Sequence, residues 1–454
     1  MTRLLVIGGG ITGLAAAWQG VRSGADVLLV EADHRLGGAV HTQRTDGLLI
    51  ENGPDSFDKH PDDARRLVDE LGLGGQVIHP SPVAGERAFV RSGGRLRPVP
   101  VGFGPVLPTE LGQLATTPIL SPLDKLRAAG DLLQPRRLEA GDAAIGPFLR
   151  ARLGEGVVRK LVDPVVGGGY GGSLDELSLD AVLPALRGQE GEYRSLLIAA
   201  RHERPSTAAG ATVPFVSLRE GLGSLVHALA EQLAVAGAEV RTGVAALGIG
   251  RHPTCSRVAL SDGSTYPVDA IVLAGAATSS ARLLAPHAPA AGAALATLQS
   301  APTTVVTLAY PVGAFPEPPG FHEWVENQPG AVRRVTLSSV KWAGRAPDDV
   351  VLIRAVIARR VAQAPLPDAS LAATVGVQLR RVLGVVGEPV HRTVSRWSMP
   401  LYAVGHRARV AAATSALAAV PGWHLAGSAL NGTGIAQCIA DGRRAASMAL
   451  ATAG

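Results

Sequence analysis

The first forty residues hold a complete dinucleotide-binding fingerprint, which constrains the fold of this chain more than any other feature. Residues 3–7 are typical of a buried strand, and the turn Gly-Gly-Gly-Ile-Thr-Gly at residues 8–13 leads into an apolar helix. Gly8 permits the tight turn, Gly10 lets the backbone approach a pyrophosphate, and Gly13 lets helix and strand pack closely. The helix N-terminus presents free N–H groups to the phosphates. The pattern therefore predicts a Rossmann-type unit at the start of the chain.

An acidic residue and a second glycine turn narrow the choice of dinucleotide. The next predicted strand, residues 26–30, ends at Glu31, which is placed to accept hydrogen bonds from a ribose 2′-OH and so argues against a 2′-phosphorylated cofactor. Arg35, Gly37 and Gly38 follow at once, in a turn that nicotinamide dehydrogenases do not require. In two-dinucleotide flavoproteins, such a turn lets the chain pass close to the FAD phosphates. We therefore expect FAD rather than NAD.

The far end of the chain carries a second helix start that points to the same site. Residues 423–427 (Trp-His-Leu-Ala-Gly) are typical of the last strand of a Rossmann sheet, and residues 431–435 lead into a helix that continues to Leu450. The partial positive charge of this helix N-terminus suits a reduced, anionic flavin near its N1–C2=O edge. We therefore expect both ends of the chain to bind the cofactor.

Composition excludes several classes of function. The formal net charge is +5, but the arginines are scattered among acidic residues and aromatic residues make up only 4% of the chain, so we expect no nucleic-acid binding. Two cysteines in 454 residues leave no disulfide framework, which favours a reducing compartment. A predicted strand begins at Arg3, where a signal peptide would lie, and no apolar run approaches the roughly 18 residues that span a bilayer. We expect a cytoplasmic protein that allows peripheral contact with the inner face of the membrane.

The order of predicted elements indicates an α/β fold in which a Rossmann-type FAD-binding domain is built from discontinuous segments. We expect this domain to comprise residues 1–85, 215–290 and 400–454. Residues 86–104 and 291–399 alternate like the strands of an antiparallel-sheet substrate domain. Residues 105–214 are expected to form a helical insertion, which is a candidate for membrane association.

Motifs spread over nearly the whole chain carry a family resemblance. Besides the opening motifs, they are Ile-Glu-Asn-Gly-Pro-Asp-Ser-Phe at residues 50–57, the glycine-rich segment 163–172, and Met-Pro-Leu-Tyr-Ala-Val-Gly-His at residues 399–406. With these, the chain resembles the porphyrinogen oxidases of heme biosynthesis, and most closely the bacterial soluble type, within the FAD-dependent amine oxidase superfamily.

The resemblance implies oxidation of coproporphyrinogen III to coproporphyrin III, with six electrons removed in three oxygen-consuming flavin cycles. Protoporphyrinogen IX is the alternative substrate. An amine oxidase, a desaturase and a non-catalytic tetrapyrrole carrier are more remote alternatives. Because flavin N5 would accept the hydride, we expect no catalytic side chain and no metal. Implied partners are the porphyrinogen, molecular oxygen, non-covalent FAD and, transiently, neighbouring heme-pathway enzymes.

The fingerprint and the resemblance together give the expected binding residues. For a substrate with acidic propionates, Lys59 is the candidate cation, with a solvated surface lysine as the alternative, and the glycine-rich segment and its tyrosine are expected beside the macrocycle. The substrate-binding set is Lys59, Gly168, Gly169 and Tyr170. The cofactor-binding set is Gly8, Gly10, Ile11, Thr12, Gly13, Glu31, Ala32, Arg35, Gly37, Gly38, Ala39, Gly53, Pro54, Asp55, Ser56, Val244, Gly427, Thr433, Gly434 and Ile435.

Overall fold

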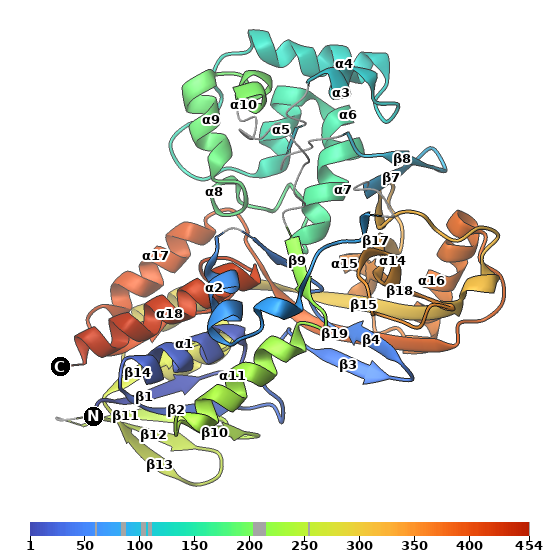
Figure 1. Cartoon of the computed structure of the whole chain (residues 1–454). Coiled ribbons are helices and arrows are strands. Elements are labelled where there is room, and N and C mark those ends of the chain that lie inside the picture. The colour runs from blue at the N-terminus through green and yellow to red at the C-terminus, as the bar shows by residue number, and fades with distance from the viewer. Residues whose placement is uncertain are drawn as a thin grey trace.

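A five-stranded parallel sheet organises the first part of the molecule in a computed structural model, which describes residues 1–59, 61–82, 88–100, 106–107, 111–202, 215–252 and 255–453 (Figure 1). In spatial order its strands are β10 (Glu239–Thr242), β2 (Asp26–Glu31), β1 (Arg3–Ile7), β14 (Ala270–Leu273) and β20 (Trp423–Leu425). The central strands are almost continuously apolar, as expected for a parallel sheet covered on both faces. Segments more than 400 residues apart thus meet in one sheet.

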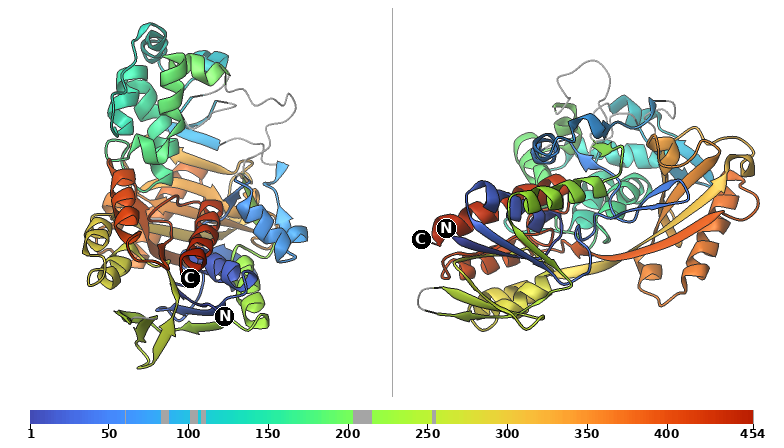
Figure 2. Two further views of the ribbon diagram at one scale, coloured as in Figure 1. Left: turned by 90° about the vertical axis from the view of Figure 1, so that its left-hand side faces the viewer. Right: turned by 60° about the horizontal axis from the view of Figure 1, so that its bottom comes forward.

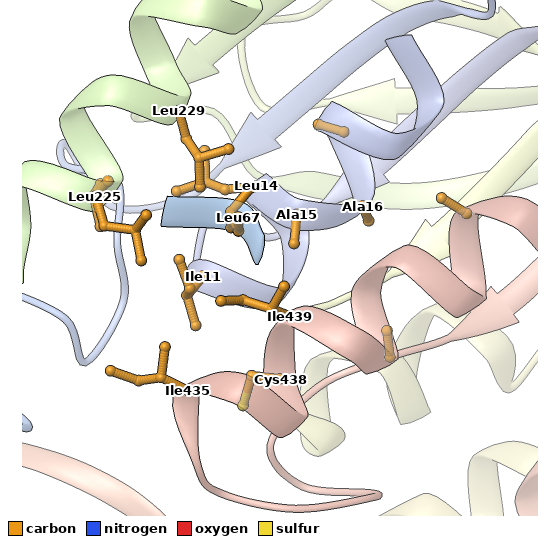
Figure 3. Packing of buried hydrophobic residues seen from close by; sticks show 14 of the residues in the cluster. Ile11, Leu14, Ala15, Ala16, Leu67, Leu225, Leu229, Ile435, Cys438 and Ile439 are labelled. Carbon is orange, nitrogen blue, oxygen red and sulfur yellow. The ribbon is translucent and has the colours of Figure 1, made fainter. Parts of the chain in front are cut away.

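Four helices cover one face of this sheet and join the two ends of the chain. They are α1 (Ile11–Arg22), α2 (Asp63–Glu70), α11 (Gly223–Val235) and α18 (Ile435–Thr452). Their apolar side chains form one buried cluster, seen from close by in Figure 3. Helices α1 and α18 approach closely because Gly442 has no side chain: a Cβ there would lie 2.1 Å from the carbonyl oxygen of Thr12.

The opposite face is covered by a small antiparallel sheet and three further helices. The sheet consists of β11 (Ala246–Arg251), β12 (Ser256–Leu260) and β13 (Thr265–Val268). The helices are α12 (Ala277–Leu284), α13 (Pro289–Ala296) and α17 (His406–Leu417). A second apolar cluster fills this side, so the parallel sheet is the middle layer of three.

A seven-stranded sheet forms the next part of the molecule (Figure 2). In spatial order its strands are β19 (His391–Leu401), β15 (Gln299–Pro311), β18 (Val350–Ile357), β17 (Val332–Leu337), β16 (Glu323–Glu326), β7 (Ala88–Ser92) and β8 (Arg95–Pro98). Helices α14 (Ser338–Lys341), α15 (Arg359–Ala362) and α16 (Asp368–Leu383) accompany it. The sheet is antiparallel as expected, except that β16 and β7 pair in parallel. Since these strands lie far apart in the chain, no hairpin turn forces them to run in opposite directions.

Two smaller sheets connect these layers. Strands β3 (Thr42–Thr45) and β4 (Leu48–Glu51) form a hairpin. Strand β9 (Phe215–Leu218) pairs with both β5 (Phe57–Asp58) and β6 (Val77–Ile78). The segment between β4 and β5 holds the Gly-Pro-Asp-Ser motif, so these pairings fix its position.

Helices make up the remaining region, drawn in cyan and green in Figure 1. They are α3 (Leu111–Thr116), α4 (Pro122–Ala129), α5 (Ile145–Leu153), α6 (Glu155–Val157), α7 (Asp163–Val166), α8 (Leu179–Val182), α9 (Ala185–Tyr193) and α10 (Leu196–His202). A fully buried Arg152 ties them together through Asp131 at 2.5 Å and Glu190 at 3.2 Å. Within the described part of the chain, no helix is both long and apolar enough to cross a membrane.

The expected fold class is therefore confirmed: an α/β fold with a discontinuous Rossmann-type part, a largely antiparallel sheet and a helical insertion. The boundaries predicted for the three domains remain a prediction. Parts of the expected helical insertion and of the segment before it, residues 101–105, 108–110 and 203–214, lie outside the described residues.

Candidate active site

A cavity of about 660 Å³ lies between the parallel sheet and the seven-stranded sheet. Its size falls in the range of small-molecule and cofactor sites. We call the wall formed by the first glycine turn, Glu31 and residues 37–39 the glycine-turn side. Most of the predicted cofactor residues line the cavity, together with one predicted substrate residue: Gly8, Gly10, Ile11, Thr12, Glu31, Gly37, Gly38, Ala39, Gly53, Pro54, Asp55, Gly169, Thr433 and Ile435.

The first glycine turn has the geometry that its sequence predicts. Gly8 adopts a φ of 111°, where a side chain would be strained and would meet Ala274 and Gly275 within 3 Å. A Cβ on Gly13 would lie 1.8 Å from the carbonyl oxygen of Gly8, so only glycine allows the helix to start here. Around Gly10, in contrast, nothing lies within 4 Å of a Cβ position. Because Gly10 lines the cavity, that empty space is room for a ligand beside the backbone.

The carboxylate of Glu31 is fixed at the end of β2. Its Oε2 accepts a hydrogen bond from the N–H of Gly9 at 2.6 Å, and its Oε1 accepts one from the N–H of Asp33 at 2.8 Å. The carbonyl oxygen of Glu31 accepts a bond from the N–H of Val244 at 2.9 Å. The predicted residue Val244 thus lies beside the acid without lining the cavity. Two backbone donors hold the carboxylate at the cavity wall. Its remaining lone pairs are left to accept hydrogen bonds from a ligand in the cavity.

Helix α18 begins at the cavity, as the C-terminal sequence predicts. Thr433, just before the helix, and Ile435, its first residue, line the cavity, and Cys438 lines it about one turn further along. The preceding loop is held by Asp441, which accepts bonds from the N–H of Gly427 at 2.9 Å and the side-chain amide of Asn431 at 2.7 Å. Since α1 also starts at the cavity, two helix N-termini direct partial positive charge toward it.

The opposite wall, which we call the sheet side, was not predicted from the sequence. It consists of side chains from β15, β18 and β19: Thr303, Val305, Arg354, Val356, Trp397 and Met399. Met399 lies in a motif that carried the family resemblance, but no role in binding was assigned to it. Arg354 had a visible signal, because it is the one charged residue in the apolar strand Val-Val-Leu-Ile-Arg-Ala-Val-Ile.

Several predicted residues lie beside the cavity rather than in its lining. Arg35 lines a smaller neighbouring cavity of about 270 Å³. Ser56 donates to the carboxylate of Asp55 at 3.0 Å, and Gly434 caps α18. The others outside the lining are Gly13, Ala32, Val244, Gly427, Lys59 and Tyr170. The surroundings of Gly168 lie outside what the structure describes.

The substrate candidates are spread over two elements. Gly167–Gly169 form a 3₁₀ turn that brings the helical region to the cavity, and Tyr170 follows it, partly buried. Burial and the nearby charge of Asp58 raise the pKa of Tyr170. Lys59 follows β5, partly buried, away from the lining. The binding roles of the whole predicted set remain proposals.

Comparisons with known proteins place the chain in a family. The model of the family "Flavin containing amine oxidoreductase" matches residues 11–450. The chain belongs to the flavin-containing amine oxidoreductases. A coproporphyrinogen III oxidase from Propionibacterium freudenreichii subsp. freudenreichii is 46% identical, with 98% of this chain and 90% of the relative covered. A coproporphyrinogen III oxidase from Bacillus subtilis (strain 168) is 32% identical, with 98% and 97% covered. A crystal structure from Exiguobacterium sp., described as a protoporphyrinogen oxidase, superimposes with a TM-score of 0.86 at 32% identity, with 99% of each chain covered.

The cofactor of this flavin-containing amine oxidoreductase is FAD, and the cavity fits it. The free space at Gly10, the two helix N-termini and the anchored carboxylate of Glu31 match a diphosphate and a ribose. In the described residues, no group of three or more His, Cys, Asp or Glu side chains could hold a metal ion. The lining of the cavity therefore fits a flavin dinucleotide.

Proposed function

We propose that this flavoenzyme oxidises coproporphyrinogen III to coproporphyrin III. The observation that carries the proposal is the 46% identity, over 98% of the chain, with a coproporphyrinogen III oxidase. When bound, FAD supplies the two-electron acceptor; three turnovers remove six electrons and six protons from one porphyrinogen, and three O₂ become three H₂O₂.

The chain's own residues bind the cofactor, orient the substrate and exclude water from the cavity. Gly10 and Glu31 hold the nucleotide, while Val305, Val356 and Met399 give the sheet side an apolar surface for a macrocycle. The turn at Gly169 closes the cavity from the helical region. Glycine there leaves room for a flat ligand against the backbone.

Oxygen uptake and porphyrin fluorescence test the proposal together. Purified holoenzyme should consume about three O₂ for each coproporphyrin III formed, as the electron balance requires. The same assay with protoporphyrinogen IX tests the second candidate, which the likeness to the Exiguobacterium structure favours. A higher kcat/KM for protoporphyrinogen IX would make it the substrate in place of coproporphyrinogen III. Oxidation of neither compound would refute a porphyrinogen oxidase activity.

The helical region also has an exposed apolar surface, and we propose that it makes peripheral contact with an anionic membrane. On and after α4, Leu123, Leu126 and Leu133 are 73%, 71% and 86% exposed. Arg136 and Arg137 next to them are exposed as well. Exposed leucines beside arginines suit the interface of an anionic bilayer. Transient contact with neighbouring heme-pathway enzymes is a further proposal.

Vesicle flotation tests this contact. The holoenzyme should float with vesicles rich in phosphatidylglycerol, and a Leu126→Ser, Leu133→Ser double variant should not. Leu247→Ser is the matched control, since Leu247 is 53% exposed on β11. Absence of flotation for the unaltered protein would overturn the proposal.

A further inference from the structure

Arg354 places a positive charge in the wall of the cavity. On β18, Arg354 and Val356 face the cavity, while their neighbours Ile353 and Ala355 belong to the buried core on the other face. Strand alternation therefore directs the arginine toward the FAD site. The side chain is 11% exposed, and its Nε has no hydrogen-bond partner among the described groups.

Arg354, Lys341 and Asp55 form a buried cluster of two cations and one carboxylate. Asp55 is 15% exposed, and its Oδ2 lies 3.4 Å from Nζ of Lys341 and 3.7 Å from Nη1 of Arg354. The indole N–H of Trp342 donates to the same oxygen at 3.1 Å. Arg354 also donates through Nη2 to the carbonyl oxygen of Gly53, which lines the cavity. The guanidinium is thus held against the Gly-Pro-Asp-Ser segment from two sides.

The cluster holds one more positive than negative charge. Burial by itself would raise the pKa of Asp55, but the charges of Lys341 and Arg354 and hydrogen bonds from Trp342 hold it well below its usual range, so Asp55 is ionised. The neighbouring Arg345 and Glu51 lie 4.0 Å apart, and burial raises the pKa of the Glu51 carboxyl, so this pair adds no excess negative charge to the cluster. A buried excess charge is costly unless something compensates it. Of the two cations, Arg354 is the one that lines the cavity.

We propose that Arg354 stabilises the negative charge that FAD gains on reduction, and so raises the flavin reduction potential. Uptake of two electrons and one proton leaves the cofactor one unit more negative, and a cation in a low-dielectric wall favours that state. Asp55 and the carbonyl oxygen of Gly53 position the guanidinium. The inference depends on FAD and not on which porphyrinogen is oxidised, so the two can fail separately.

The test is a charge series measured on holoenzyme. In Arg354→Gln, the two-electron midpoint potential should fall by about 30 mV, which is a tenfold change in the reduction equilibrium. Sulfite, which forms an anionic adduct with oxidised flavin, should bind about tenfold more weakly. Arg354→Lys should recover most of both effects. Arg392→Gln is the control, an exposed arginine of the same sheet outside the cavity lining, and should change neither value.

Asp55→Asn should shift the midpoint potential in the opposite direction, which gives the test a second, independent readout. Removal of the carboxylate leaves two uncompensated cations, so the midpoint potential should rise. If Arg354→Gln is isolated without FAD, Asp55→Asn and Lys341→Gln carry the test, with a rise expected in the first and a smaller fall in the second. An unchanged potential in Arg354→Gln, or a fall in Asp55→Asn, would overturn the proposal.

Discussion

The two walls of the cavity are built by different means. The glycine-turn side uses backbone: N–H groups at the start of α1, bare Cα atoms at Gly8 and Gly10, and one anchored carboxylate, Glu31. The sheet side uses side chains that come from three separate strands, including Arg354 and Met399. Backbone can recognise a diphosphate because every nucleotide presents the same phosphates. Recognition of one particular ligand needs shape and charge of its own, which side chains provide.

The largest effect is expected where a side chain would enter the backbone wall. Gly13→Ala places a Cβ 1.8 Å from the carbonyl oxygen of Gly8, a backbone atom, so α1 or β1 must shift to admit it. We expect a loss of at least about 3 kcal/mol in the free energy of unfolding, measured by urea denaturation of the apoprotein.

The control for this prediction separates packing from binding. Gly10→Ala meets no atom within 4 Å, so the apoprotein should unfold as the unaltered one does. The new methyl group would occupy the space assigned to FAD, and FAD binding should weaken strongly in a fluorescence titration. Equal destabilisation by both substitutions would show that the glycine-turn side is made for packing alone.

A smaller effect is expected from the charged side chain of the glycine-turn side, Glu31. Glu31→Ala removes the acceptor of the Gly9 and Asp33 N–H groups and any bond to a ribose. Loss of a charged hydrogen bond costs about 1.5–3 kcal/mol, so the Kd for FAD should rise about 10- to 100-fold. Asp33→Asn, an exposed neighbour, is the control. If Glu31→Ala bound FAD normally, the carboxylate would only be holding the turn.

A weaker and more specific prediction concerns Lys59, which lies in neither wall of the cavity. If the lysine meets a propionate, Lys59→Gln should raise KM for coproporphyrinogen III about two- to fivefold with kcat unchanged, since a partly exposed ion pair is worth about 0.2–1 kcal/mol. Lys125→Gln, on α4, is the matched control. Unaltered kinetics in Lys59→Gln would support the alternative of a solvated lysine.

The same contrast explains what the sequence could predict. The turn from Gly8 to Gly13 was predictable because the glycines are required by contacts within the same strand–turn–helix unit. Arg354 was visible as a charge in an apolar strand, but its role was not predictable, because that role depends on the distant Asp55 and on the carbonyl oxygen of Gly53. Alternation along a strand shows that two faces exist, but not which of them meets a cofactor. The parallel pair of β7 and β16 was missed for the same reason.

The smallest effect concerns Cys438, where the helix N-terminus and burial have opposite effects on the pKa of the thiol. It lies in the first turns of α18 and lines the cavity, and a helix N-terminus ordinarily lowers the pKa of a thiol. Burial instead raises the pKa of Cys438 to about 11, so roughly one thiol in a thousand is ionised at pH 8. Iodoacetamide at pH 8 should therefore label the partly exposed Cys255 and spare Cys438, as read by mass spectrometry of the holoenzyme. Cys255→Ser should remain unlabelled. Rapid labelling of Cys438 in that variant would mean that the helix terminus outweighs burial, and that backbone dipoles dominate this part of the cavity as well.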